Sequence, residues 1–310
     1  AVAGLTPEAQ RERVRSMVFT ALRTTGRDSN QISSGFAGDY GRGYAALEVL
    51  FPGVSDTTAG GAGAAYVGNI DLFASRIKTE RNGNIEFLIP GGNLIVGLAN
   101  TPADLVKTGS NVLGVVAAAE GTVRGFARDD MLVNQSRILT VGGGDVLLWS
   151  SEGDIDAGKG KKTATAVPPP LITVDDKGNV TQVLQGAVSG SGIGALSSGG
   201  VVAGDVDLIA PKGTVNAGDA GIRAGNLNIA ALVVLGADNI SVSGTSAGTP
   251  IADTSAVTAA SSGATSGGDD TGKVVEALNQ AAAESAKAAQ EMASAMRPSV
   301  VRVDVLGFGE

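Results

Sequence analysis

The amino-acid sequence predicts a mainly β fold, a right-handed parallel β-helix (solenoid), and three observations support this prediction. Glycine is abundant, with 46 residues in a chain of 310, while aromatic residues make up only 4%. A short motif recurs along the chain: glycine, then Asn or Asp, then apolar residues at alternate positions. Paired copies stand nine residues apart, as at Gly83 and Gly92, which is typical of short strands on neighbouring sides of a stacked coil.

The copies of the motif predict how the coils stack. Eight copies begin with glycine, at Gly68, Gly83, Gly92, Gly144, Gly153, Gly204, Gly213 and Gly225. Alternate apolar residues such as Val206 and Leu208 are expected to point inward, whereas Asp207 and Asn228 are expected to point to water. Glycine permits the sharp turn before each strand, and Asn or Asp can bond its own backbone there. We infer two strands and about twenty residues per coil, with right-handed connections.

Residues 1–66 are predicted to form a helical segment that caps the β-helix at its N-terminal side. Thr6, Pro7 and Glu8 are typical of a helix start, and apolar residues follow at helical spacing. A second short helix is expected from Tyr44 to Leu50. The first helix carries arginines that are expected to form a solvated face: Arg11, Arg13, Arg15, Arg23 and Arg27.

Residues 67–243 are predicted to form the β-helix, with a hairpin excursion at about 163–200. Three consecutive prolines, at 168–170, cannot donate to a strand ladder and therefore interrupt the stack. Residues 171–174 and 180–184 flank a turn-forming segment, which predicts a β-hairpin. Residues 244–272, rich in Ser, Ala and Gly, are predicted to form a second excursion. Residues 273–310 are predicted to form a helix, with a heptad seam of small residues, and a final strand.

Composition excludes several functional classes. The chain has no Cys and no His, so disulfides, thiolate metal sites and His-dependent nucleophilic mechanisms are excluded. The net charge of −8 disfavours nucleic acid as a partner. No cofactor is expected. The first residues do not resemble an export signal, so such a signal is expected to lie upstream.

Two long segments resemble the C-terminal domain of large exoproteins of the filamentous haemagglutinin family. They are residues 142–160, GGGDVLLWSSEGDIDAGKG, and residues 204–222, GDVDLIAPKGTVNAGDAGI. The triple proline between them and the closing residues 303–310 fit the same pattern. The resemblance covers roughly residues 7–310 and carries over no catalytic residue.

This resemblance implies a location and a set of partners. Such proteins are two-partner secretion substrates, which leave Gram-negative cells through a dedicated outer-membrane transporter. The resemblance therefore implies a protein that is secreted or held at the outer-membrane surface. It also implies partners on a host or neighbouring cell, either a receptor or a glycan, with self-association as a further possibility.

The acidic turns raise two hypotheses about sites. Asp154, Asp156, Asp205 and Asp207 are weak calcium candidates, because oxygen-rich turns bind calcium in some β-helices. The glycine-rich nonapeptide that builds such sites is missing, so we expect no metal. Asp154 and Asp156, with Glu152 nearby, also have a separation compatible with glycoside hydrolysis, about 7 Å for side chains two apart on a strand.

Four residues are candidates for contact with a partner. Trp149, the single tryptophan, is expected to pack in the core or under an excursion, or else to form an exposed contact. Lys159, Lys161 and Lys162 form a small basic loop, which is either a solvated loop or a glycan contact.

The sequence as a whole predicts a structural and adhesive cell-surface protein that is not an enzyme. It would act in attachment, aggregation or biofilm formation. Two alternatives stay open: a polysaccharide-binding or polysaccharide-cleaving β-helix, and a self-assembling fibre subunit.

Overall fold

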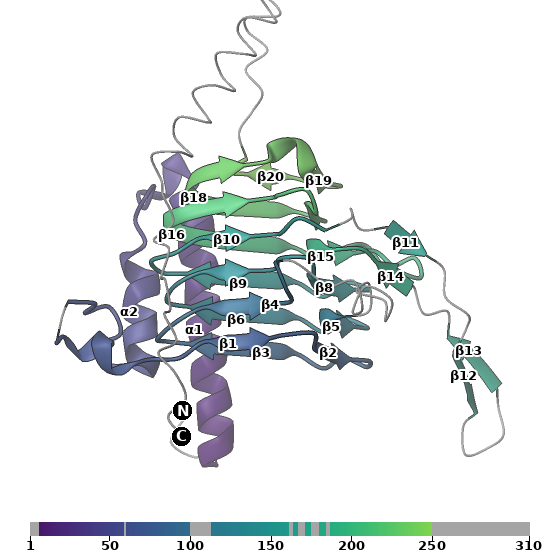
Figure 1. Cartoon of the computed structure of the whole chain (residues 1–310), viewed down its shortest axis with the longest axis horizontal. Helices are drawn as coiled ribbons and strands as arrows, with labels where there is room; N and C mark the ends of the chain where they lie inside the picture. Colours follow the sequence, from purple (N-terminus) through teal and green to yellow (C-terminus); the bar gives the residue numbers. More distant parts are fainter. Residues whose placement is uncertain are drawn as a thin grey trace, which may run out of the picture. The chain divides into compact units, whose positions relative to one another are not determined.

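Parallel strands wind from residue 70 to residue 247 in stacked coils, each with three sides (Figure 1). This computed structural model describes residues 6–58, 60–99, 113–160, 164–166, 171–174, 180–183 and 187–249. All of these residues belong to one unit, Ala1–Pro250. The predicted parallel β-helix is therefore confirmed.

Each side of the coils is a parallel sheet, and two of the sheets share the long strands β16 (Val206–Asn216) and β18 (Leu227–Leu235). The first side comprises the second halves of β16 and β18 and β1 (Ile70–Leu72), β4 (Leu94–Val96), β7 (Met131–Leu132) and β10 (Ile155–Asp156). The second side comprises the first halves of β16 and β18, together with β3 (Ile85–Ile89), β6 (Val123–Ala127), β9 (Val146–Ser150) and β20 (Ser246–Ala247). The third side comprises β2 (Arg76–Thr79), β5 (Gly114–Ala118), β8 (Arg137–Val141), β15 (Gly192–Leu196), β17 (Ile222–Ala224) and β19 (Ile240–Val242).

The coil length agrees with the prediction, but the number of strands per coil does not. Val206 pairs with Leu227 and Ile222 pairs with Ile240, which are steps of 21 and 18 residues. The prediction of two strands per coil was wrong because strands of the third side begin without the Gly-Asx motif. Strand β8, for example, follows Ser136. Counting copies of the motif therefore detects only two of the three sides.

Asn and Asp side chains in the turns before the strands join one coil to the next. On the first side, the backbone N–H of Asn93 donates to Oδ1 of Asn69 (2.9 Å) and that of Asp130 donates to Oδ1 of Asn93 (2.8 Å). The ladder continues from Asp154 to Asp130 (2.8 Å) and from Thr214 to Asp154 (2.7 Å). These side chains thus satisfy turn amides of the coil above, and they do so at the corner of the solenoid.

The glycine of the motif lies where successive coils approach most closely. A Cβ atom at Gly144 would overlap the carbonyl oxygen of Gly121 in the coil below, and one at Gly213 would overlap that of Gly153. The backbones touch at these positions, so the requirement for glycine is one of space.

We expect Gly144→Ala to destabilise the protein by about 2 kcal/mol or more, because the neighbouring carbonyl is fixed by the coil below. Urea unfolding followed by circular dichroism would measure the change. Gly35→Ala is a useful control, since Gly35 has φ 71° but open space around it. Equal losses in the two variants would show that the close approach between coils is not the cause.

The interior of the solenoid consists of columns of aliphatic side chains, one from each coil. One column on the third side contains only isoleucine and valine: Ile77, Val115, Ile138, Ile193, Ile222 and Ile240. Its middle members are buried, while Ile77 and Ile240 at the two ends are only partly buried. Branched aliphatic side chains pack well in such stacks because they fill the pleated inner surface.

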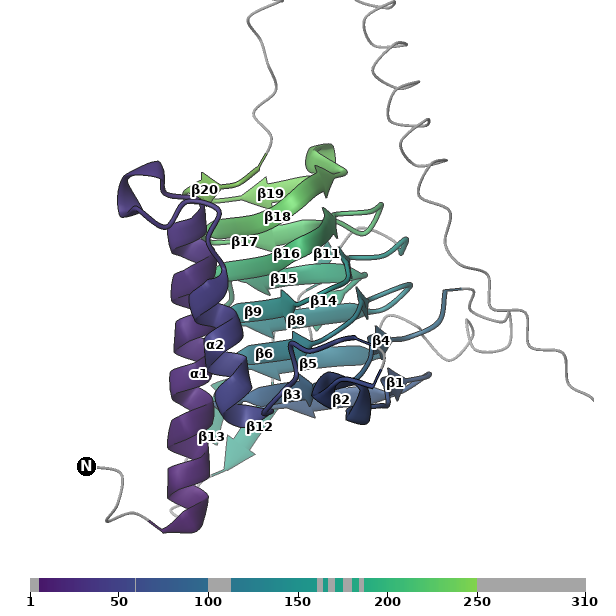
Figure 2. The same ribbon diagram turned by 90° about the vertical axis from the view of Figure 1, so that its left-hand side faces the viewer.

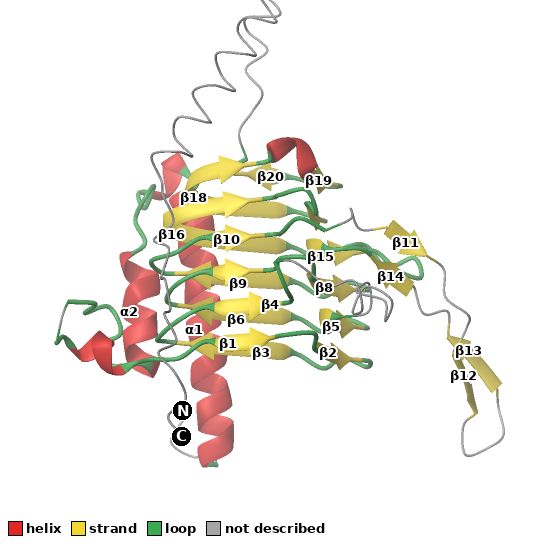
Figure 3. Ribbon diagram, in the orientation of Figure 1, coloured by secondary structure: helices red, strands yellow, loops and turns green. Residues whose placement is uncertain are grey.

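Two helices cover the outer face of the second side. Helix α1 (Pro7–Ser29) and helix α2 (Gly41–Leu50) are the predicted N-terminal helical segment, and the hydroxyl of Thr6 accepts from the N–H of Ala9 at the start of α1. Helix α1 runs along the stack and contacts β9, β16 and β18, so the helices lie across the coils instead of over their end (Figures 2 and 3).

Short 3-10 helices complete the described helical elements: η1 (Ile32–Ser34), η2 (Ala62–Ala65) and η4 (Ala237–Asn239). None of the helices in the described ranges has the length and apolar character needed to cross a membrane.

A pair of antiparallel ribbons lies between β10 and β15. Strand β11 (Ala164–Ala166) pairs with β14 (Ala187–Ser189), and β12 (Leu171–Val174) pairs with β13 (Val180–Val183). The second pair stands where the sequence predicts a hairpin. The predicted helix and final strand at 273–310, and nearly all of the predicted excursion at 244–272, fall outside the described residues.

Candidate functional site

An arginine–aspartate seam joins α1 to the second side of the solenoid. Nε of Arg27 lies 2.7 Å from Oδ1 of Asp207, and Nη2 of Arg27 lies 2.8 Å from Oδ2 of Asp205. Arg23 contacts Asp145 (2.9 Å) and Asp207 (3.3 Å), which extends the seam to the coil below. Three acidic residues from two copies of the motif therefore hold the helix against the coils.

The seam corrects two predictions from the sequence. Asp207 and Asn228 do not point to water, because α1 covers this face and buries both of them. Arg23 and Arg27 are not part of a solvated helix face, because they face the carboxylates of the solenoid. Near the start of the helix, Arg15 pairs in the same way with Glu86 of β3 (3.4 Å), and Arg124 also contacts Glu86.

The pKa values of the seam follow from burial and charge. Burial raises the pKa of Asp207, against the opposing effect of Arg27 and Arg23. Burial alone would also raise the pKa of Asp205, but hydrogen bonds from Asn226 and Arg27, with the nearby guanidinium charges, lower it overall. The hydrogen bond to Asp207 raises the pKa of Arg27 and keeps that side chain charged.

We expect Asp205→Asn to make stability less sensitive to acid. A carboxyl group whose pKa is lower in the folded state than in the unfolded state stabilises the folded protein. This stabilisation is complete above the unfolded pKa of about 3.9, and it is lost as the pH falls through the folded pKa. The raised pKa of Asp207 acts in the opposite direction in both proteins, and the variant reduces this effect only in part, because the charge of Asp205 is the smallest of its causes. Unfolding measured from about pH 5 to pH 2 should therefore show a smaller loss in the variant. A profile unchanged from wild type, with exposed Asp219→Asn as the control, would contradict this role.

Trp149 lies at the centre of the contact between the helices and the solenoid. Its side chain points outward from β9, yet it is 0% exposed because α2 packs over it. Tyr40 and Tyr44 meet its ring edge-on, with centroids 6.2 and 5.7 Å away, and its indole N–H donates to Oγ of Ser151 (3.0 Å). A Cβ atom at Gly43 would overlap the indole ring. The hypothesis that Trp149 is an exposed partner contact is therefore wrong.

The acidic candidates for calcium or hydrolysis take part in turns and ion pairs. Asp156 accepts from the N–H of Gly158 (2.6 Å) and from Asn216 (3.2 Å), while Glu152 pairs with Lys212 (2.8 Å). Asp154 belongs to the Asx ladder, and Asp205 and Asp207 contact arginines instead of leaving oxygens for a cation. Within the described ranges, no three acidic side chains gather as metal ligands would.

The basic loop is only partly described. Lys159 is exposed, whereas Lys161 and Lys162 lie outside the described residues. A glycan contact at this loop stays a prediction.

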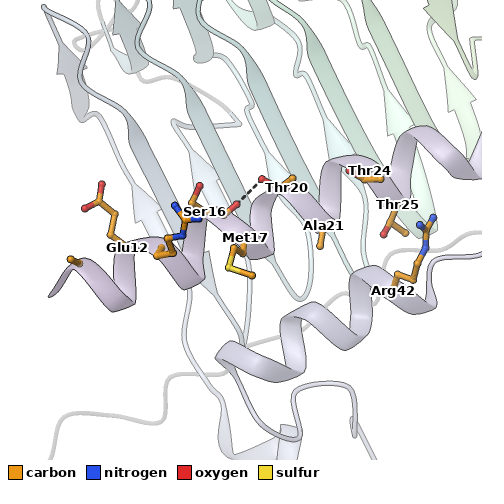
Figure 4. Close-up of a pocket in the computed structure, with 10 residues that line it drawn as sticks. Glu12, Ser16, Met17, Thr20, Ala21, Thr24, Thr25 and Arg42 are labelled. Carbon is orange, nitrogen blue, oxygen red and sulfur yellow. Dashed lines mark hydrogen bonds between the residues drawn. The ribbon is translucent and has the colours of Figure 1, made fainter. Parts of the chain in front are cut away.

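An open groove of about 720 Å³ follows the outer surface of α1 beside α2 (Figure 4). Its lining combines hydroxyl, charged and sulfur-containing side chains from α1 with one arginine from α2: Glu12, Arg13, Ser16, Met17, Thr20, Thr24 and Arg42. Met17 is exposed in this groove. The sequence could not predict the groove, because it depends on the placement of α2 beside α1.

Stacked parallel strands, Asx ladders and a helix-covered side define the class of this protein, a β-helical repeat protein. Residues 143–251 match the family described as "Filamentous haemagglutinin family outer membrane protein". The resemblance predicted from the sequence is thereby confirmed over this segment. The description agrees with the predicted location, secreted or at the outer-membrane surface of a Gram-negative bacterium. No curated protein and no solved structure matches the chain.

Proposed function

We propose that this chain is a structural and adhesive module of a cell-surface protein, acting in attachment, aggregation or biofilm formation, and that it is not an enzyme. The observation that carries the proposal is the family match over residues 143–251, on coils whose acidic residues serve the fold. The parent chain would cross the outer membrane through a two-partner secretion transporter. Its partners would be a receptor or a glycan on a host or neighbouring cell.

The groove along α1 is the contact surface we assign to this function. Ser16, Thr20 and Thr24 provide hydroxyl groups, and Arg13 provides a guanidinium group, which together can bond the hydroxyls of a sugar. Met17 adds a polarizable apolar surface that adapts to different ligands. A rigid helix locked to the solenoid by the seam holds these groups in fixed positions.

Binding of the purified chain to cells and to a glycan panel tests the proposal, with released sugars measured in the same samples. We expect binding without sugar release. Thr20→Arg, which places a long side chain in the groove, should weaken binding about tenfold, a loss of about 1.4 kcal/mol. Thr57→Arg, at an exposed threonine outside the groove lining, should bind like wild type.

Two results would contradict the proposal in different ways. Sugar release would show that the chain cleaves polysaccharides, which would contradict the proposal that it is not an enzyme. Binding that is equal in Thr20→Arg and wild type would move the contact away from the groove.

A further inference from the structure

The first coil presents three strand edges at one end of the solenoid. Strands β1, β2 and β3 each pair with one neighbour only, in the second coil, and none has a partner on its other side among the described residues. The helices do not close this end, because α1 and α2 lie along the second side. An uncovered strand edge is a template for pairing with another strand.

Apolar side chains surround these edges. The inward residues Ile70, Leu72 and Ile77 are only partly buried, since no coil below covers them. Val67 and Phe73, on either side of β1, are 83% and 59% exposed. The outward side chains of β1 and β2 are charged, as is usual for strand edges that face water, but the inward side chains at this end are apolar and incompletely covered, which indicates a surface that is covered in use.

The last described coil has complementary features. Its inward residues Val234 and Ile240 are partly buried, and Leu232 and Leu235 are 70% and 46% exposed. Within the described part of the chain, β19 pairs only with β17, and the second half of β18 pairs only with β16. The first coil and the last described coil thus have the surfaces that two neighbouring coils use to contact each other.

We propose that the first coil of one molecule stacks on the last coil of a second copy of this chain, head to tail. Continuity of the interior supports this occupant. Ile77 and Ile240 are the two ends of one aliphatic column, and Ile70 and Val234 are the two ends of another. A second copy would continue each column with a residue of the same kind, in the parallel register that every coil already uses.

Charge on the third side does not oppose this arrangement. Stacking Ile77 on Ile240 in the parallel register aligns the basic residues Arg76 and Lys78 with the neutral residues Asn239 and Ser241. A contact between unlike surfaces does not close on itself, so it produces open linear assemblies instead of a fixed dimer.

Two variants that each block one end test this proposal on the full chain. Val67→Glu/Phe73→Glu places charge beside β1, and Leu232→Glu/Leu235→Glu places charge on the last coil. We expect the mass of the wild type, measured by sedimentation or light scattering, to rise with concentration. Each variant alone should remain monomeric. An equal mixture of the two should form a heterodimer, because each supplies the end that the other lacks.

Val49→Glu is the matched control, since Val49 is an exposed aliphatic residue that belongs to α2 and to neither end coil. It should associate like wild type. A wild type that stays monomeric at high concentration would overturn the proposal. So would a last-coil variant that still self-associates, because the first coil would then pair with itself. Neither result affects the binding test of the groove.

Discussion

Replacing Trp149 by Ala is expected to lower the free energy of unfolding by about 3–5 kcal/mol, the largest effect of any single change considered. The indole is fully buried, and it fills the space between β9 and α2. Its loss removes the edge-on contacts with Tyr40 and Tyr44 and leaves a cavity that the stiff solenoid cannot close. The hydroxyl of Ser151 also loses its donor.

Urea unfolding by circular dichroism would measure this loss. Trp149→Phe should lose less, because a smaller ring retains part of the contact, and Val49→Ala on the exposed face of α2 should change little. Trp149 is the only tryptophan, so its fluorescence in the wild type reports directly on this contact. A loss below about 1 kcal/mol would mean that α2 does not pack on the solenoid as described.

The interior of the solenoid could be predicted from the sequence because strand alternation is a local property. Val206 and Leu208 were expected to point inward, and both are buried in the core. The third side was missed because its strands follow turns that lack the motif. Local patterns thus predicted the coil length and the parallel stacking, but not the cross-section.

The seam could not be predicted because it depends on where a distant helix lies. Asp207 occupies an outward position, and in an uncovered solenoid such a residue points to water. Its partner, Arg27, is 180 residues earlier in the chain. One signal was present in the sequence. Arg23 and Arg27 are four residues apart, about 6 Å along the helix axis, which is close to the spacing of about 4.8 Å between coils.

This match in spacing explains why the helix runs along the stack. A helix aligned with the solenoid axis brings one residue per turn to each successive coil, so a basic helix can pair with a column of acidic turns. Trp149 then becomes buried for the same reason, since the helical segment that supplies the arginines also covers the outward face of β9. The groove, on the opposite surface of α1, is left free for a ligand.

Arg27→Met should lower the free energy of unfolding by about 2–3 kcal/mol, less than for a fully buried pair, because Arg27 is partly exposed and Arg23 remains near Asp207. The loss of stability arises because the carboxylate of Asp207 loses its ionic partner. Asp207 is 0% exposed, so water cannot solvate it while α1 stays in place. Methionine keeps most of the length of the side chain, so packing along the helix is largely preserved.

The double variant Arg27→Met/Asp207→Leu distinguishes loss of the ion pair from loss of packing as the cause. It should recover most of the stability, because it removes the buried charge together with its partner. A double variant as unstable as Arg27→Met would instead mean that the guanidinium acts by packing α1 on the coils and that the charge of Asp207 is not what requires it.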